Sequence, residues 1–201
     1  MFASKLSVGL SVLLIAAYGL GLVFSLKTHR DLFVGAAHHD DEEAWPIGAA
    51  AATLAAVTVL VALISEVFVE SVQEAALAFG MTQAFVGFIV VAIVGGAAEM
   101  ASAFSAARKN RLDMSVGIAL GSAVQIALFV APVLVLASYV LGPAPMSLQF
   151  WPGAVVMMLI ATMAASMVSN NGRSAWFTGV LLLAVYLVFA VTLYLLPPRA
   201  P

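Results

Sequence analysis

The chain contains no cysteine among its 201 residues. Disulfides, thiolate metal sites and cysteine nucleophiles are therefore excluded. Charge is also scarce, because Asp, Glu, Lys and Arg together make up 9% of the residues, whereas soluble domains carry about 25%. The net charge is −2 and the sequence pI is about 5.8. This balance gives no indication of a nucleic-acid partner.

Hydrophobic residues take up 64% of the chain, and the mean hydropathy is +1.12. A membrane-spanning helix needs about 20 mostly apolar residues. The segments that qualify are 6–26, 47–79, 83–107, 114–141, 148–169 and 175–196. The first of them is longer than the apolar region of a secretory signal peptide, so we expect it to remain as a helix. The sequence therefore predicts an all-α integral membrane protein with about six transmembrane helices.

The distribution of Lys and Arg over the connecting segments predicts the orientation in the membrane, since cytoplasmic loops carry the excess of positive charge. One side holds Lys27, Arg30, Arg108, Lys109, Arg111 and Arg173, and the other holds Lys5 and Arg199. We therefore expect segments 31–46 and 108–111 in the cytoplasm and both chain ends outside. Segment 31–46 contains two histidines and four consecutive acidic residues, which we interpret as a solvated acidic loop rather than a metal site.

Four glutamates lie inside the predicted spans, at positions 66, 70, 74 and 99. A charge at the bilayer centre costs at least ~2.5–3.5 kcal/mol on insertion scales, so such residues face a protein interior or a water-filled cavity. Glu66, Glu70 and Glu74 are four residues apart and share one stripe of their helix. Any one of these glutamates could be a neutral structural residue, and Glu74 could be solvated at the membrane surface.

Counting about 1.5 Å per residue places several polar groups at one depth. Glu66 lies roughly 20 Å from the outer end of its helix and Glu99 roughly 14 Å from the inner end of the next. Both positions are near the middle of a hydrocarbon core about 30 Å thick. Ser122 and Gln125 share one face of the fourth predicted helix at a similar depth. They are either ligands or interhelical hydrogen-bond partners.

The stretch VGGAAEM, residues 94–100, places two glycines directly before Glu99. Gly95 and Gly96 lower helix propensity and allow the backbone to unwind. A discontinuous helix at the midplane offers free carbonyl groups and a half-helix end beside a carboxylate, as transporters use for ions. All the candidate ligands are oxygens, which suit a hard cation such as Ca²⁺ rather than zinc or copper.

VGGAAEM and the following KNRLDMSVGIALGSAVQIALFVAPVLVL resemble the cation/proton exchanger family of Ca²⁺/H⁺ antiporters, within the calcium/cation antiporter superfamily. The second repeat of that family typically reads G-N-A-A-E, then K-N-K-M-D, then I-G-V-A-x-G-S-S-x-Q-I-A-L-F-V-x-P. The closely matching blocks are residues 95–99, 109–113 and 117–132, and weaker similarity covers nearly the whole chain. Gly96 stands where the family has Asn, which removes an amide oxygen that a cation could use. Met100 replaces a frequent His, and Asn171 stands where some relatives carry Asp.

Family members have two inverted halves of five helices. The resemblance implies that residues 1–30 are the transmembrane helix that ends a missing first half, and that residues 47–201 are the second repeat of five helices. Segment 31–46 is the cytosolic loop between them. The chain would then be a fragment, or it would assemble with a second polypeptide or a second copy.

The resemblance further implies a secondary active transporter that exchanges Ca²⁺ for H⁺ in a bacterial plasma membrane, with no cofactor besides the transported ion. Glu99 and Glu66 would bind either the cation or protons, and Gln125, Ser122, Gly95 and Gly96 would supply neutral oxygens. Glu70 and Glu74 would form an entry path for ions from outside. Two alternatives stay open: an antiporter or channel for another cation such as Na⁺ or Mn²⁺, and a non-transporting membrane subunit. A membrane enzyme is least favoured, because the spans contain no nucleophile–base pair.

Overall fold

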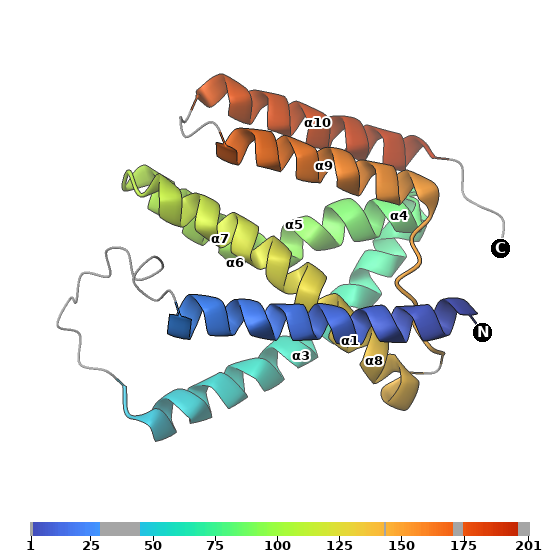
Figure 1. The fold of residues 1–201 in the computed structure, drawn as a ribbon. Helices are drawn as coiled ribbons and strands as arrows, with labels where there is room; N and C mark the ends of the chain where they lie inside the picture. Colours follow the sequence, from blue (N-terminus) through green and yellow to red (C-terminus); the bar gives the residue numbers. More distant parts are fainter. Residues whose placement is uncertain (1, 29–44, 143, 171–174, 197–201) are drawn as a thin grey trace. The chain divides into compact units, whose positions relative to one another are not determined.

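The computed structural model describes residues 2–28, 45–142, 144–170 and 175–196, which are almost wholly helical and include no strand (Figure 1). Among these residues, five helices are long and apolar enough to cross a membrane, or six when the bent pair Gln83–Gly95 and Ala97–Arg108 counts as one span. The predicted all-α integral membrane fold is thus confirmed. The predicted acidic loop lies outside the described residues, apart from Trp45 and Pro46.

The helices follow the predicted spans closely, and three of them continue into or contain π-helical segments. Their bounds are α1 (Phe2–Val23), η1 (Phe24–Thr28), α3 (Ile47–Ala78), α4 (Gln83–Phe85), η2 (Val86–Val91), α5 (Ala92–Gly95), α6 (Ala97–Arg108), α7 (Leu112–Gln125), η3 (Ile126–Val130), α8 (Ala131–Leu141), α9 (Pro152–Asn170) and α10 (Trp176–Leu195). The segments α7, η3 and α8 together form one span of 30 residues.

The fifth span begins at Pro152, four residues later than the predicted start at residue 148. Proline has no N–H and restricts the residue before it to extended conformations, so it favours the first position of a helix. The Trp151 carbonyl oxygen accepts hydrogen bonds from the N–H groups of Ala154 (2.9 Å) and Val155 (3.2 Å). Pro152 therefore fixes the start of α9, which the apolar count alone places too early.

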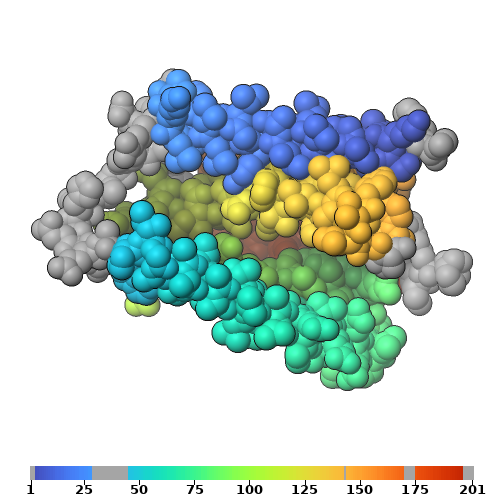
Figure 2. Space-filling model, turned by 90° about the horizontal axis from the view of Figure 1, so that it is seen from below, coloured from blue at the N-terminus to red at the C-terminus, as the bar shows by residue number. Residues whose placement is uncertain are grey.

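The chain divides into two compact units. The first comprises residues 1–35 and 96–185, and the second comprises residues 36–95 and 186–201. Within the first unit, α1 packs along η3 and α8, as Figure 2 shows for the blue helix against the yellow and orange ones. The rings of Tyr18 and Phe129 stack in this contact with their centroids 5.3 Å apart.

Serine hydroxyls hold the segment after α8 against α1 and α8. Ser138 Oγ donates to the Val135 carbonyl (2.7 Å) and accepts from the Met146 N–H (2.8 Å). In the same way, Ser7 Oγ on α1 accepts from the Leu148 N–H (3.2 Å). Both serines are buried, at 8% and 2% exposure. They satisfy backbone donors of a non-helical segment, which would otherwise be costly to bury.

The second unit contains the sharp turn from α3 into α4. Gly80 adopts a left-handed φ of 64°, and the N–H of Met81 donates to the Ala76 carbonyl (2.8 Å). This is the hydrogen-bond pattern of a Schellman motif, which ends a helix by satisfying its free carbonyls. The next residue, Thr82, then begins α4 by accepting the N–H of Phe85 on its side-chain oxygen (3.1 Å).

Thr82 also connects α4 to the far end of the chain, because its hydroxyl donates to the Leu193 carbonyl of α10 (2.7 Å). In a continuous helix this carbonyl would accept the N–H of residue 197. Residue 197 is proline and has no N–H, so the Thr82 hydroxyl takes the place of the missing donor. Leu193 is 1% exposed, and the rings of Phe85 and Tyr194 meet edge to face beside it at 5.3 Å.

We predict that Thr82→Val destabilises the protein by about 1–2 kcal/mol, because it removes a helix cap and the donor to a buried carbonyl. Thr58→Val is the matched control, since the Thr58 hydroxyl bonds only to the Leu54 carbonyl of its own helix (2.7 Å) and is exposed. The measurement is the unfolding midpoint of both variants in mixed detergent micelles. Equal losses of stability in the two variants would contradict the assigned role of Thr82.

Candidate cation-binding site

The helix that carries Glu99 is interrupted at the residues predicted for the break. The segment α5 ends at Gly95, α6 begins at Ala97, and the chain is bent by 54° across the break. The predicted discontinuous helix is therefore confirmed. Gly96 has φ −93° and ψ 10°, a conformation open to residues other than glycine. The glycines act here by lowering helix propensity rather than by permitting a left-handed backbone.

Glu99 lies in the first turn of α6. The first hydrogen bond across the start of this helix runs from the Met100 N–H to the Gly96 carbonyl (2.9 Å). The N–H groups before it have no acceptor in the helix, and they form its partially positive end. The C-terminal end of α5 leaves carbonyl oxygens without intrahelical donors on the other side of the break. A carboxylate, free carbonyls and a helix N-terminus thus occur within a few residues.

The helices α6 and α7 form an antiparallel hairpin that positions Glu99 relative to the fourth predicted span (Figure 1). Its turn is a second Schellman motif, in which Asn110 has a left-handed φ of 57° and the Arg111 N–H donates to the Ala106 carbonyl (3.0 Å). Counted from this turn at about 1.5 Å per residue, Glu99 is roughly 14 Å along α6 and Ser122 roughly 15 Å along α7. The two residues are therefore level within the hairpin.

Ser122 and Gln125 lie in the last turns of α7, three residues apart and on one face. Ser122 is half-buried and Gln125 is exposed. Neither side chain has a hydrogen-bond partner among the residues that the structure describes. Whether they act as cation ligands or as interhelical hydrogen-bond partners stays a prediction.

The π-helical segment η3 directly after Gln125 was not predicted from the sequence. Such segments occur mostly as single turns inside α-helices and frequently at functional sites. Pro132 explains η3, because its ring would clash with the Leu128 carbonyl and it offers no N–H to this carbonyl. Pro132 is therefore the sequence signal for the segment. The corresponding segment η2 precedes the break at Gly96 and has no proline to account for it.

The other three glutamates belong to α3 in the second unit, and all three are exposed, as Glu99 is in α6. Their spacing on this continuous helix keeps Glu66, Glu70 and Glu74 on one face, as predicted. The described residues contain no group of three His, Asp or Glu side chains close enough to hold a metal ion. Glu99 belongs to the first unit, so the predicted pairing of Glu66 with Glu99 stays a prediction.

Comparison with known proteins supports the resemblance noted in the sequence. Residues 49–195 match the family model described as sodium/calcium exchanger protein. The Ca²⁺/H⁺ antiporter ChaA of Bacillus subtilis (strain 168) is 44% identical over 200 residues, which cover 96% of this chain and 57% of the relative. Vacuolar cation/proton exchanger 3 of Arabidopsis thaliana is 36% identical, with 92% of this chain and 42% of the relative covered.

The fold has a match among solved structures as well. The structure titled native YfkE superimposes with a TM-score of 0.77 at 39% identity, and the match covers 96% of this chain and 54% of that chain. The chain thus spans about half the length of the curated relatives and of the solved structure that it matches. On the extent of the family match and the identity to these relatives, the chain belongs to the sodium/calcium exchanger protein family.

Proposed function

We propose that this chain forms half of a cation/proton antiporter that exchanges Ca²⁺ for H⁺ across a bacterial plasma membrane. The observation that carries the proposal is the position of Glu99, in the first turn of α6 directly after the helix break at Gly96. The names of the similar proteins, Ca²⁺/H⁺ antiporter and cation/proton exchanger, support the choice of ions. These relatives are named as transporters and not as enzymes.

Exchange follows from the chemistry of a carboxylate group. Protons and metal cations bind the same carboxylate oxygens, so the binding of a cation displaces a proton. Ca²⁺ prefers six to eight oxygen ligands. Glu99 supplies carboxylate oxygens close in sequence to the Gly95 carbonyl and to the Gly96 carbonyl, which accepts the Met100 N–H and keeps a second lone pair. Ca²⁺ and protons thus occupy the site in turn, and exposing it first to one side and then to the other couples the two fluxes.

The remaining predicted ligands complete this proposal. Ser122 and Gln125 supply neutral oxygens from the helix that is level with Glu99 in the α6–α7 hairpin. Glu66 supplies a second carboxylate from α3, with Glu70 and Glu74 on the same face of α3 as an acidic entry path. Two carboxylates balance the charge of one divalent cation, which favours Ca²⁺ over Na⁺ as the transported ion.

A second half completes the transporter in this proposal. It is supplied by a further part of the same polypeptide, by another polypeptide or by a second copy of the chain. The share of the relatives' length supports a second half, because the chain covers 57% of the Bacillus subtilis relative and 54% of the solved structure. The exposure of α3 supports it too, since none of the 32 residues of this apolar helix is buried. A partner that covers α3 would also remove its glutamates from the lipid.

We predict that Glu99→Gln abolishes proton-driven Ca²⁺ uptake, because glutamine keeps the shape of the side chain but cannot exchange a proton for a cation. The measurement is uptake of radioactive Ca²⁺ into vesicles that hold this chain alone, and into vesicles that also hold the N-terminal half of the Bacillus subtilis relative. Glu74→Gln, in the proposed entry path nearer the end of α3, is the comparison variant and should lower uptake without abolishing it. Absence of uptake by the unsubstituted chain in both preparations would contradict the proposal.

We predict that Gln125→Leu weakens Ca²⁺ uptake and leaves stability within about 0.5 kcal/mol, the range typical of exposed positions. The amide oxygen is lost as a ligand, and no hydrogen bond within the described chain is broken. The unfolding midpoint and the Ca²⁺ concentration for half-maximal uptake are measured on the same preparation. Lower stability with unchanged uptake would instead identify Gln125 as a structural hydrogen-bond partner.

A further inference from the structure

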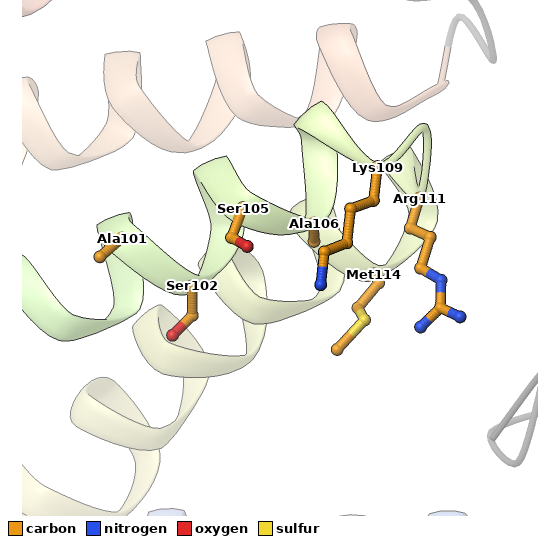
Figure 3. A pocket seen from close by; sticks show the side chains of 7 residues that line it. All are labelled: Ala101, Ser102, Ser105, Ala106, Lys109, Arg111 and Met114. Carbon is orange, nitrogen blue, oxygen red and sulfur yellow. The ribbon is translucent and has the colours of Figure 1, made fainter. Parts of the chain in front are cut away.

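A pocket of about 400 Å³ lies along α6 and the turn between α6 and α7 (Figure 3). It combines an apolar wall with a wall of hydroxyl and cationic side chains. The lining residues are Ala101, Ser102, Ser105, Ala106, Lys109, Arg111 and Met114. None of them belongs to the cation site proposed above.

The polar wall of this pocket is built by one face of α6 and by the turn. Ser102, Ser105 and Lys109 are separated by three and four residues and therefore share a face. Figure 3 shows their hydroxyl and ammonium groups on the same side of the helix, with Arg111 extending beside Met114. The left-handed Asn110 and the bond from the Arg111 N–H to the Ala106 carbonyl (3.0 Å) hold Arg111 at the pocket edge.

The polar wall offers hydrogen-bond donors without an acceptor nearby, from the side chains of Ser102, Ser105, Lys109 and Arg111. Among the described residues, Lys109 and Arg111 form no ion pair, and the hydroxyls of Ser102 and Ser105 have no hydrogen-bond partner. Other helical hydroxyls, such as that of Thr162, donate to the carbonyl four residues earlier (2.8 Å). The pocket thus presents two cations and two hydroxyls, a donor set that matches the oxygens of a phosphate group.

We propose that this pocket binds the phosphate of an anionic phospholipid. The pocket lies where two apolar helices end, which is the level of the lipid headgroups, and the expected orientation places it on the cytoplasmic face. Basic pockets between membrane helices on that face bind phospholipid headgroups. The apolar wall of Ala101 and Met114 contacts the start of the acyl chains, which a soluble phosphate does not have.

The test is native mass spectrometry of the full chain with phosphatidylglycerol, phosphatidylcholine or inorganic phosphate. Each basic residue near the surface changes lipid affinity about fivefold. We therefore expect the double variant Lys109→Gln, Arg111→Gln to bind phosphatidylglycerol about thirtyfold more weakly. The matched control is Lys27→Gln with Arg108→Gln, which removes the same charge from exposed positions that do not line the pocket and should weaken phosphatidylglycerol binding clearly less.

A further variant keeps every charge, so that the test does not depend on the folding of the double variant. Ser105→Leu fills the pocket with an apolar side chain and should also release the lipid. If the pocket and control variants lost equal affinity for phosphatidylglycerol, the binding would be due to diffuse surface charge. This result would overturn the proposal. Equal binding of phosphatidylcholine, or displacement of the lipid by equimolar inorganic phosphate, would overturn it as well.

Discussion

The hydrocarbon core of a membrane offers no hydrogen-bond partner to the backbone, so every N–H and C=O within it must be satisfied by the chain itself. The closed ends of two helices in this protein follow from that constraint. At the end of α3, Gly80 closes a Schellman motif, and the Thr82 hydroxyl supplies the donor that Pro197 denies to the Leu193 carbonyl. After α8, two buried serines satisfy the N–H groups of Met146 and Leu148.

The break at Gly96 stands apart from these closed ends. A helix is interrupted there inside an otherwise apolar span, and Glu99 follows in the next turn. Unsatisfied backbone at such depth is tolerated where it lines a cavity or an ion path. The same interruption that is costly for a purely structural helix therefore becomes useful in a transporter, because it provides carbonyl oxygens and a helix N-terminus beside a carboxylate.

The spans and the break were predictable because both depend on local sequence. Apolar length identifies the spans, and the two glycines before Glu99 lower helix propensity at one point. To predict the start of α9, the local effect of Pro152 on the backbone has to be considered. To predict the segment η3, the same is true of Pro132. The pocket at the α6–α7 turn depends on the left-handed conformation of Asn110 and on side-chain directions. A pairing of Glu66 with Glu99 depends on packing between distant helices, about which periodicity carries no information.

We propose that Glu99 exchanges protons for Ca²⁺, and proton release on Ca²⁺ binding is the first measurement to make. The chain, assembled with the N-terminal half of its Bacillus subtilis relative, would be titrated with Ca²⁺ in weak buffer while a dye reports the pH. We expect that Ca²⁺ releases protons, and that Glu99→Gln removes this release while Glu74→Gln keeps it. Ca²⁺ binding without proton release, or release unchanged in Glu99→Gln, would contradict the claim.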